Sequence, residues 1–134
     1  MLNKTKEIIW GIWFNDFSEF DRNWVIWISL YDEAKMWKWY WSEAMDLFLK
    51  YSLEYLWLNK VKLNVYSFNE RGIKSYEKCW FKKVWVLKEE KYILWKYEDL
   101  IYMEVLNKEW KKRKKLNKYI ILILKNWLFK KYIK

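Results

Sequence analysis

A helix is predicted where apolar residues recur every three or four positions after Ser42. Ser42 is a suitable N-cap, and the repeat continues to about Leu56. One face of this helix would carry Ala44, Leu47, Phe48, Tyr51 and Tyr55. Further apolar surface comes from Met45, Leu49 and Leu53 on other sides. We therefore expect a largely buried helix over 42–56 that ends near Trp57, where a glycine in the left-handed conformation is normal.

A second, shorter helix is predicted over 70–78. Asn69 stands at its N-cap position, and Ile73 and Tyr76 lie on its apolar side. The helix should end before Trp80, again at a position that favours a left-handed residue.

Strands are predicted on both sides of these helices. From Val61 to Tyr66 apolar and polar side chains alternate, as in a strand with one buried face. Similar patterns predict strands over 8–14, 24–31, 81–87, 91–94 and 97–106. The dipeptide Trp95-Lys96 would form the last reversal, where a Gly-X pair suits a tight hairpin. The predicted fold class is α/β, with a mixed, mostly antiparallel sheet and flanking helices.

Tryptophan occupies positions where this pattern requires glycine. The chain has two glycines, Gly11 and Gly72, where about nine are usual for its length. It has 13 tryptophans and no proline. Glycine adopts positive φ and allows close backbone approach, and an indole suits such places least. Predicted loops, helix ends and the hairpin hold Trp37, Trp39, Trp41, Trp57, Trp80 and Trp95. Packed strand aromatics explain Trp13, Trp24, Trp27 and Trp85 equally well.

We hypothesise that a difference in genetic code explains this pattern. Some bacterial codes assign the codon UGA to glycine, and others assign it to tryptophan. A gene written in the first code and translated in the second would acquire tryptophan at such glycines. Gly11 and Gly72 would come from ordinary glycine codons, and the richness in Lys, Asn, Ile and Tyr fits an A/T-rich gene. UGG codons at positions 37, 39 and 41 would disprove the hypothesis.

The net charge of +10 is confined to the C-terminal end. Residues 1–110 carry 17 basic and 17 acidic side chains, whereas residues 111–134 carry 10 basic ones and no acidic one. The first part is therefore neutral overall, and we expect no nucleic-acid partner for it. A chain of 134 residues makes one domain at most, which we place at 1–110, with a basic, partly hydrophobic tail at 111–134.

Histidine is absent, and Cys79 is the only cysteine. This excludes an intrachain disulfide, Ser-His-Asp or Cys-His catalysis, and most zinc sites, so we expect no metal. The longest apolar run, 119–124, is far shorter than the ~20 residues of a membrane span. The N-terminus lacks an apolar stretch of signal-peptide length, so we expect a cytoplasmic protein. No feature indicates an oligomeric state.

One segment resembles the pyrophosphate-binding loop of the GNAT N-acetyltransferases, namely Met36 to Ala44, with the sequence MWKWYWSEA. In that family the loop has the pattern Gln/Arg-x-x-Gly-x-Gly/Ala at the start of a helix. Met36 stands at the Gln/Arg position and departs from it. Trp39 and Trp41 stand at the two small positions.

A second segment, Asn69 to Phe81, is similar to the family pattern Asn-x-x-(Ala/Gly)-x-x-x-Tyr-Glu-Lys-x-Gly-Phe. Residues 97–103 and Trp110 resemble the end of the branch that acts on ribosomal-protein N-termini, polyamines and amino sugars. The likeness covers about residues 8–110 and lacks the family's first strand and first helices. We therefore expect the C-terminal portion of the domain, that is, a partial acyl-CoA N-acyltransferase fold.

The resemblance implies direct transfer of an acetyl group from acetyl-CoA to a primary amine of a small molecule or a protein N-terminus. Tyr76 would be the catalytic residue that protonates the departing thiolate, and Asn69 would contact the cofactor. Backbone N–H groups at a helix start suit the pyrophosphate. The other cofactor-binding residues would be Met36, Trp37, Lys38, Trp39, Tyr40, Trp41 and Ser42. The strands at 24–31 and 61–66 should be neighbours that splay apart near 37–41.

The same residues have simpler explanations when each is taken alone. Tyr76 on an apolar helix face is a core aromatic, Asn69 is an N-cap, and Cys79 is a small buried hydrophobe. The indoles at 37–41 would also fill the volume that phosphates need, so we expect the activity of the chain as written to be impaired.

The tail allows a second class of function. Five basic residues at 111–115 precede an apolar stretch at 119–129, and a helix over both would suit a membrane surface. The simpler alternative is an appended or read-through sequence. A non-enzymatic cationic, aromatic-rich module that binds anionic membrane or nucleic acid is thus the alternative to an acetyltransferase, and the neutral charge of 1–110 argues against it.

Overall fold

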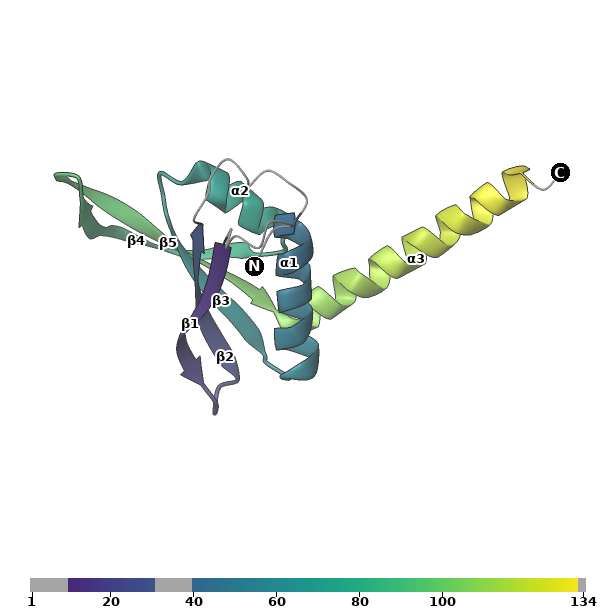
Figure 1. The fold of residues 1–134 in the computed structure, drawn as a ribbon, viewed down its shortest axis with the longest axis horizontal. Helices are drawn as coiled ribbons and strands as arrows, with labels where there is room; N and C mark the ends of the chain where they lie inside the picture. Colours follow the sequence, from purple (N-terminus) through teal and green to yellow (C-terminus); the bar gives the residue numbers. More distant parts are fainter. Residues whose placement is uncertain (1–9, 31–39, 133–134) are drawn as a thin grey trace.

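The computed structural model describes residues 10–30 and 40–132, whose arrangement is drawn in Figure 1. The strands are β1 (Trp10–Ser18), β2 (Asn23–Leu30), β3 (Lys60–Tyr66), β4 (Lys82–Ile93) and β5 (Lys96–Leu106). The helices are α1 (Tyr40–Lys50), continued by the π-helical turn η2 (Tyr51–Tyr55), then α2 (Glu70–Lys78) and α3 (Asn107–Tyr132). The strand predictions at residues 8, 9 and 31 and the loop prediction at 36–39 lie outside the described residues.

The strands form one sheet in the order β1-β2-β3-β5-β4. β2 and β3 are parallel, and every other neighbouring pair is antiparallel. Because parallel strands need a long crossover, α1 and η2 lie between β2 and β3 in the chain. This arrangement confirms the predicted α/β class and the mixed, mostly antiparallel sheet.

The core lies between the helices and one face of the sheet. β3 is central, and its predicted alternation is confirmed because Val61, Leu63 and Val65 are all buried. The paired positions of β5, Val105, Met103 and Ile101, are buried beside them. The helices complete this cluster with Met45, Leu49, Leu53, Ile73 and Trp110.

The buried face of α1 differs from the predicted one. Met45, Leu49 and Leu53 are fully buried, whereas Leu47 and Tyr51 are more than half exposed. Both sets are apolar at helical spacing, so the pattern did not distinguish them, and the contact with the sheet decides. The prediction of a largely buried helix was therefore wrong for the side that carries Leu47 and Tyr51.

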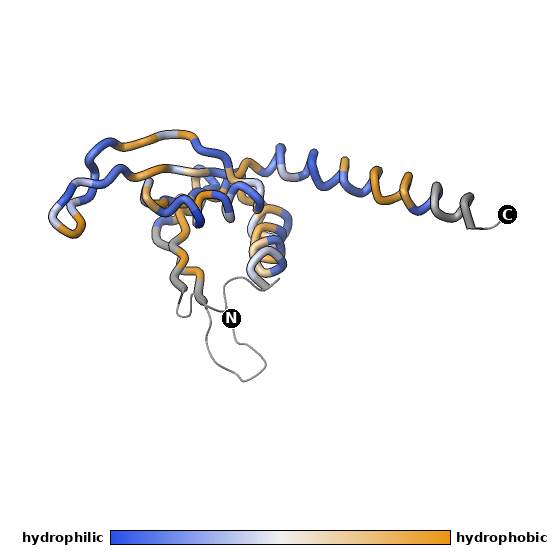
Figure 2. The backbone as a smooth tube through the Cα atoms, turned by 90° about the horizontal axis from the view of Figure 1, so that it is seen from above, coloured by the Kyte–Doolittle hydropathy of each residue, from blue (hydrophilic) through white to orange (hydrophobic). Residues whose placement is uncertain are grey.

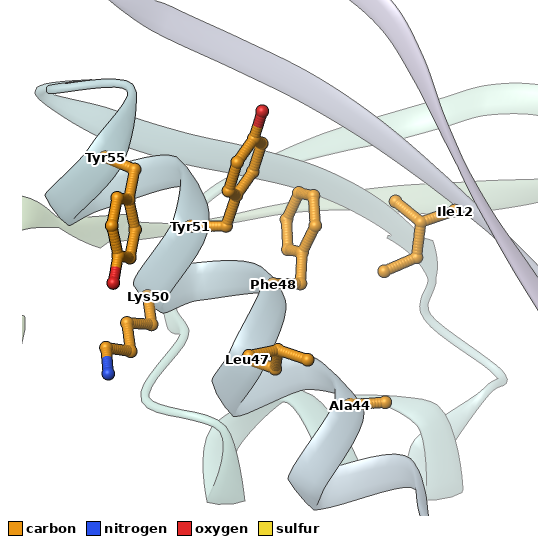
Figure 3. A pocket seen from close by; sticks show the side chains of 7 residues that line it. All are labelled: Ile12, Ala44, Leu47, Phe48, Lys50, Tyr51 and Tyr55. Atoms are coloured by element: carbon orange, nitrogen blue, oxygen red, sulfur yellow. The ribbon is translucent and has the colours of Figure 1, made fainter.

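That open side of α1 lines an apolar groove with the edge strand β1. The groove has a volume of about 570 Å³, and Figure 3 shows the side chains that surround it. They are Ile12, Ala44, Leu47, Phe48, Lys50, Tyr51 and Tyr55. The rings of Tyr51 and Tyr55 stack with centroids 6.3 Å apart at the end of α1.

β4 corrects the prediction of two separate strands at 81–87 and 91–94. It is one strand with an irregular register between Leu87 and Lys91, where Glu89 has a φ of 52°. Asp99 on β5 stabilises this bulge, since its Oδ1 accepts the N–H of Glu89 at 2.9 Å and its Oδ2 accepts from Lys88 Nζ at 2.8 Å. A bulge interrupts the alternation of side chains without ending the strand. From the sequence alone it therefore looks like the boundary between two strands.

The reversal between β4 and β5 lies one residue earlier than predicted. Its central residues are Leu94 and Trp95, with φ of 50° and 67°, and Lys96 already belongs to β5. Two consecutive positive φ values are those of a tight type I′ hairpin turn.

α3 begins inside the domain and projects away from it, as Figure 1 shows. The side chain of Asn107 donates from Nδ2 to the carbonyls of Leu53 and Leu58, each at 2.8 Å. Trp110 is buried, and Lys114 Nζ lies 3.0 Å from Asp46 Oδ2 of α1. Farther out the helix is hydrophilic and then hydrophobic, as the colours of Figure 2 show. Within the described residues no helix meets the length and apolarity that crossing a membrane requires.

Candidate functional site

The parallel strands β2 and β3 pair along only part of their length. They pair from Asn23 opposite Lys60 to Ile26 opposite Leu63, yet β2 continues to Leu30 and β3 to Tyr66. This confirms the prediction that these strands are neighbours, and their pairing ends before either strand does, as expected of strands that splay apart. Most of the loop 37–41, where the splaying was predicted, lies outside the described residues. Ligands of α/β proteins commonly bind at the carboxyl ends of parallel strands, so this gap is the first candidate for a site.

Helices start at the same end of the sheet, because α1 follows β2 and α2 follows β3 in the chain (Figure 1). Three of the predicted cofactor-binding residues, Tyr40, Trp41 and Ser42, form the first residues of α1. Ser42 therefore lies inside the helix, and the prediction that it is the N-cap was wrong. The start of a helix is the positive end of its dipole, where a negative charge is stabilised. The other predicted loop residues, Met36, Trp37, Lys38 and Trp39, lie outside the described residues.

Trp41 has the backbone of an ordinary helical residue, so no positive φ requires glycine there. Its side chain is half-buried and packs against the core. The indole also contacts the ring of Tyr76, with centroids 6.0 Å apart. The expectation of a small residue at position 41 therefore rests on the cofactor and not on the backbone.

Asn69 caps α2 as predicted. Its Oδ1 accepts the N–H of Gly72 at 2.9 Å, and its carbonyl accepts the N–H of Ile73 at 3.0 Å. Gly72 fits this cap closely, because an added Cβ would lie 2.6 Å from Asn69 Nδ2. The side chain is exposed at the end of β3, which leaves its cofactor role a prediction.

Tyr76 lies in the last turn of α2, half-buried between the rings of Trp41 and Phe81. Burial, and secondly the nearby Cys79, raises the pKa of its phenol from 10.0 to about 12. Burial and the charge of Asp46 likewise raise the pKa of the Cys79 thiol to about 11. Both groups are therefore protonated at neutral pH, and Tyr76 can act there as a proton donor.

A basic hollow of about 520 Å³ flanks the start of α2. Its lining consists of Phe68, Asn69, Glu70, Arg71, Lys74, Ser75 and Lys78. The cations Arg71, Lys74 and Lys78 are spaced by three and four residues along the helix, so they share one side. Sequence reasoning missed this surface, although that spacing is a signal that could have found it.

Comparison with known proteins supports the fold. No protein-family model matches this chain, and no curated protein sequence matches it. A chimera of spermidine N-acetyltransferase SpeG from Vibrio cholerae and hSSAT is similar, with a TM-score of 0.72 and 25% identity over 81% of this chain and 65% of that chain. A SpeG point mutant from the same organism has a TM-score of 0.77 at 24% identity, over 85% of this chain and 67% of its own.

A dodecameric structure of spermidine N-acetyltransferase from Vibrio cholerae is similar to the same extent, with a TM-score of 0.75 and 24% identity over 84% of this chain. The chain covers 65% of the length of that structure and of the chimera, which is less than two thirds. The described residues have the fold of the GNAT N-acetyltransferases, the family that segments 36–44 and 69–81 resemble.

Proposed function

We propose that this chain carries the acetyl-transfer site of an acetyl-CoA-dependent N-acetyltransferase that acts on a primary amine of a polyamine. One observation carries the proposal. β2 and β3 stop pairing after Ile26 and Leu63, at the end of the sheet where Tyr76 of α2 meets Trp41 in the first turn of α1.

The backbone at this end of the sheet suits the arm of acetyl-CoA. Beyond Leu63 the facing edges of β2 and β3 are not paired with each other. Such edges favour an extended ligand whose amide groups bond to the backbone as an added strand would, and the pantetheine arm has two amide groups.

Two further features suit the phosphates of the cofactor. The first turn of α1, at Tyr40 to Ser42, lies at the positive end of the helix dipole, which favours an anion. The basic hollow of α2, with Arg71, Lys74 and Lys78, attracts negative charge beside Asn69. Asn69 follows β3 in the chain and lines this hollow, which is consistent with a contact to the cofactor.

The proposed chemistry needs one proton donor. The amine nitrogen attacks the thioester carbonyl carbon, the C–N bond forms, and the C–S bond breaks. The sulfur leaves as a thiolate and takes the proton of the Tyr76 hydroxyl. The extra proton of the amine passes to solvent, from which the phenolate regains its own.

The pKa of Tyr76 is compatible with this role inside a dry site. A thiol in water ionises near pH ~8.5, well below the phenol's pKa of about 12. Burial raises the pKa of a thiol, however, and the neighbouring Cys79 shows the direction of this effect, because burial together with the charge of Asp46 raises its pKa to about 11. A departing thiolate beside Tyr76 experiences the same desolvation.

The choice of a polyamine follows from the solved structures, which are spermidine N-acetyltransferases. The sequence resemblance alone also permits amino sugars and protein N-termini. This chain covers about two thirds of the length of those structures.

The side chain at position 41 does not fit this function in the chain as written. The indole of Trp41 contacts Tyr76 at the end of the sheet where the acetyl group would arrive. We therefore propose the activity for the form with small residues at the loop and expect it to be impaired in the tryptophan form.

An acetylation assay tests the proposal. The protein is made from its complete gene with glycine at 37, 39, 41, 57, 80 and 95, and thiol release from acetyl-CoA is followed with spermidine, glucosamine and a peptide with a free N-terminus. We expect release with spermidine above the other two amines. Release only with glucosamine or the peptide would overturn the polyamine assignment, and release with none would overturn the function.

A further inference from the structure

Three tryptophans have a backbone conformation that L side chains rarely adopt. Their φ angles are 55° for Trp57, 75° for Trp80 and 67° for Trp95. A Cβ in this left-handed region lies too close to the following carbonyl, and glycine alone avoids that contact. Among the described residues, six non-glycine residues have positive φ, and half of them are tryptophan. No described glycine has positive φ.

The hydrogen bonds at the end of α2 show most clearly that position 80 favours glycine. The N–H of Trp80 donates to the carbonyl of Glu77 at 3.1 Å, and the N–H of Phe81 donates to the carbonyl of Tyr76 at 3.1 Å. These are the two hydrogen bonds of a Schellman motif, and the Tyr76 and Phe81 rings make its usual apolar contact at 6.2 Å. In this motif the left-handed position, here that of Trp80, is usually glycine.

The other two positions lie at equivalent places. Trp57 follows Leu56, the C-cap of η2, and Trp95 is the second central residue of the β4–β5 turn. Helix C-terminal positions and the second position of such hairpin turns are the two places where glycine is most enriched.

Packing does not account for indoles at two of these positions. The side chain of Trp57 is 67% exposed and that of Trp95 is 89% exposed. Lys111 Nζ lies 5.5 Å from the ring of Trp57, an exposed cation–π contact that is weak. Trp80 is better covered, with Arg113 at 5.1 Å from its ring. Trp110 shows the contrast, because it is fully buried in a helix at negative φ.

We infer that positions 57, 80 and 95 carry glycine in the protein that the source cell makes, because UGA codons assigned to glycine have been read as tryptophan. Trp110 is a true tryptophan encoded by UGG. The backbone thus separates two kinds of tryptophan in one chain, which composition does not.

Peptide mass spectrometry of the protein from its source cells tests this directly. We expect glycine at positions 57, 80 and 95 and tryptophan at 110, with UGA and UGG at the corresponding codons. Tryptophan at any of the first three positions in the natural protein would overturn the inference for that position. This measurement does not depend on whether a recombinant variant folds.

Thermal unfolding of single variants tests the physical reason. Trp57→Gly and Trp95→Gly should each raise the unfolding midpoint by a few degrees, because they remove left-handed strain from exposed sites. Trp57→Ala and Trp95→Ala keep a Cβ at positive φ and should gain clearly less. Equal gains for glycine and alanine would mean that loss of the indole, and not the backbone, is responsible.

Trp85→Gly is the matched control. Trp85 is 66% exposed, like Trp57, but lies in β4 with φ in the negative range. Glycine weakens a strand interior, so this variant should have a lower midpoint. A rise of the same size as for Trp57→Gly would overturn the backbone explanation.

Discussion

The indole of Trp41 and the phenol of Tyr76 lie against each other, with ring centroids 6.0 Å apart and planes inclined by 54°. Trp41 comes from the first turn of α1 and Tyr76 from the last turn of α2. The contact therefore joins the helices that follow β2 and β3, the two strands whose pairing ends early. It also places an indole beside the proposed proton donor, at a position where the family pattern that the loop resembles has a small residue.

Acetyl-CoA binding should depend on the tryptophans of the loop. We expect no useful binding by the chain as written. The form made from the complete gene with glycine at 37, 39, 41, 57, 80 and 95 should bind. A matched form that retains only Trp41 isolates the contact with Tyr76 and should bind more weakly than the sixfold variant. Isothermal titration measures all three, and micromolar binding by the tryptophan form would show that the loop tolerates indoles.

Tyr76→Phe should lower turnover in the glycine-restored enzyme. General acid catalysis contributes roughly 10²–10⁴-fold, and phenylalanine keeps the ring contact with Phe81. Affinity for acetyl-CoA should change little, since only a hydroxyl is lost. Tyr92→Phe, an exposed tyrosine near the hairpin, is the control and should turn over normally. An unaltered rate for Tyr76→Phe would mean that water or another group protonates the thiolate.

Stability should fall at high pH because of Tyr76 and Cys79. Their pKa values in the folded state are about 12 and about 11, above the ordinary 10.0 and 9.0. The folded state therefore holds these protons more tightly than the unfolded state. Their contribution is complete below pH 9 and is lost as the pH rises from 9 to 12, by about 2–3 kcal/mol for each group.

Chemical denaturation across this pH range measures the effect. Tyr76→Phe and Cys79→Ala should each flatten the decline in the free energy of unfolding. A decline as steep in both variants as in the parent protein would assign the loss to other groups.

Asn69 and Gly72 should show strong energetic coupling. Asn69→Ala removes the N-cap of α2 and should cost about 1 kcal/mol. Gly72→Ala should also destabilise, because the new Cβ would lie within 2.9 Å of Asn69 Oδ1 and closer to two other atoms of that side chain. In the double variant those atoms are gone and alanine favours the helix, so the second substitution should become neutral or stabilising. Additive losses in a double-mutant cycle would contradict the close contact.

Local chemistry made much of this protein predictable from its sequence. Three features depend only on neighbours in the chain. They are the alternation of β3, the start of α2 at its Asn69 cap, and the unsuitability of Trp57 and Trp80 as residues at helix ends. Such features follow from the spacing and type of residues, which is why the structure confirms them with little change. The loop at 36–39 and the chemistry of Tyr76 stay predictions.

Tertiary contacts decided the rest. Two apolar stripes run along α1, and only the sheet selects Met45 and Leu49 for burial and leaves Leu47 to line the groove. β4 continues through its bulge because Asp99 of the neighbouring strand binds it, a partner that no local pattern identifies. The contact of Trp41 with Tyr76 likewise joins residues 35 positions apart, since it exists only where two helices meet over the gap between β2 and β3.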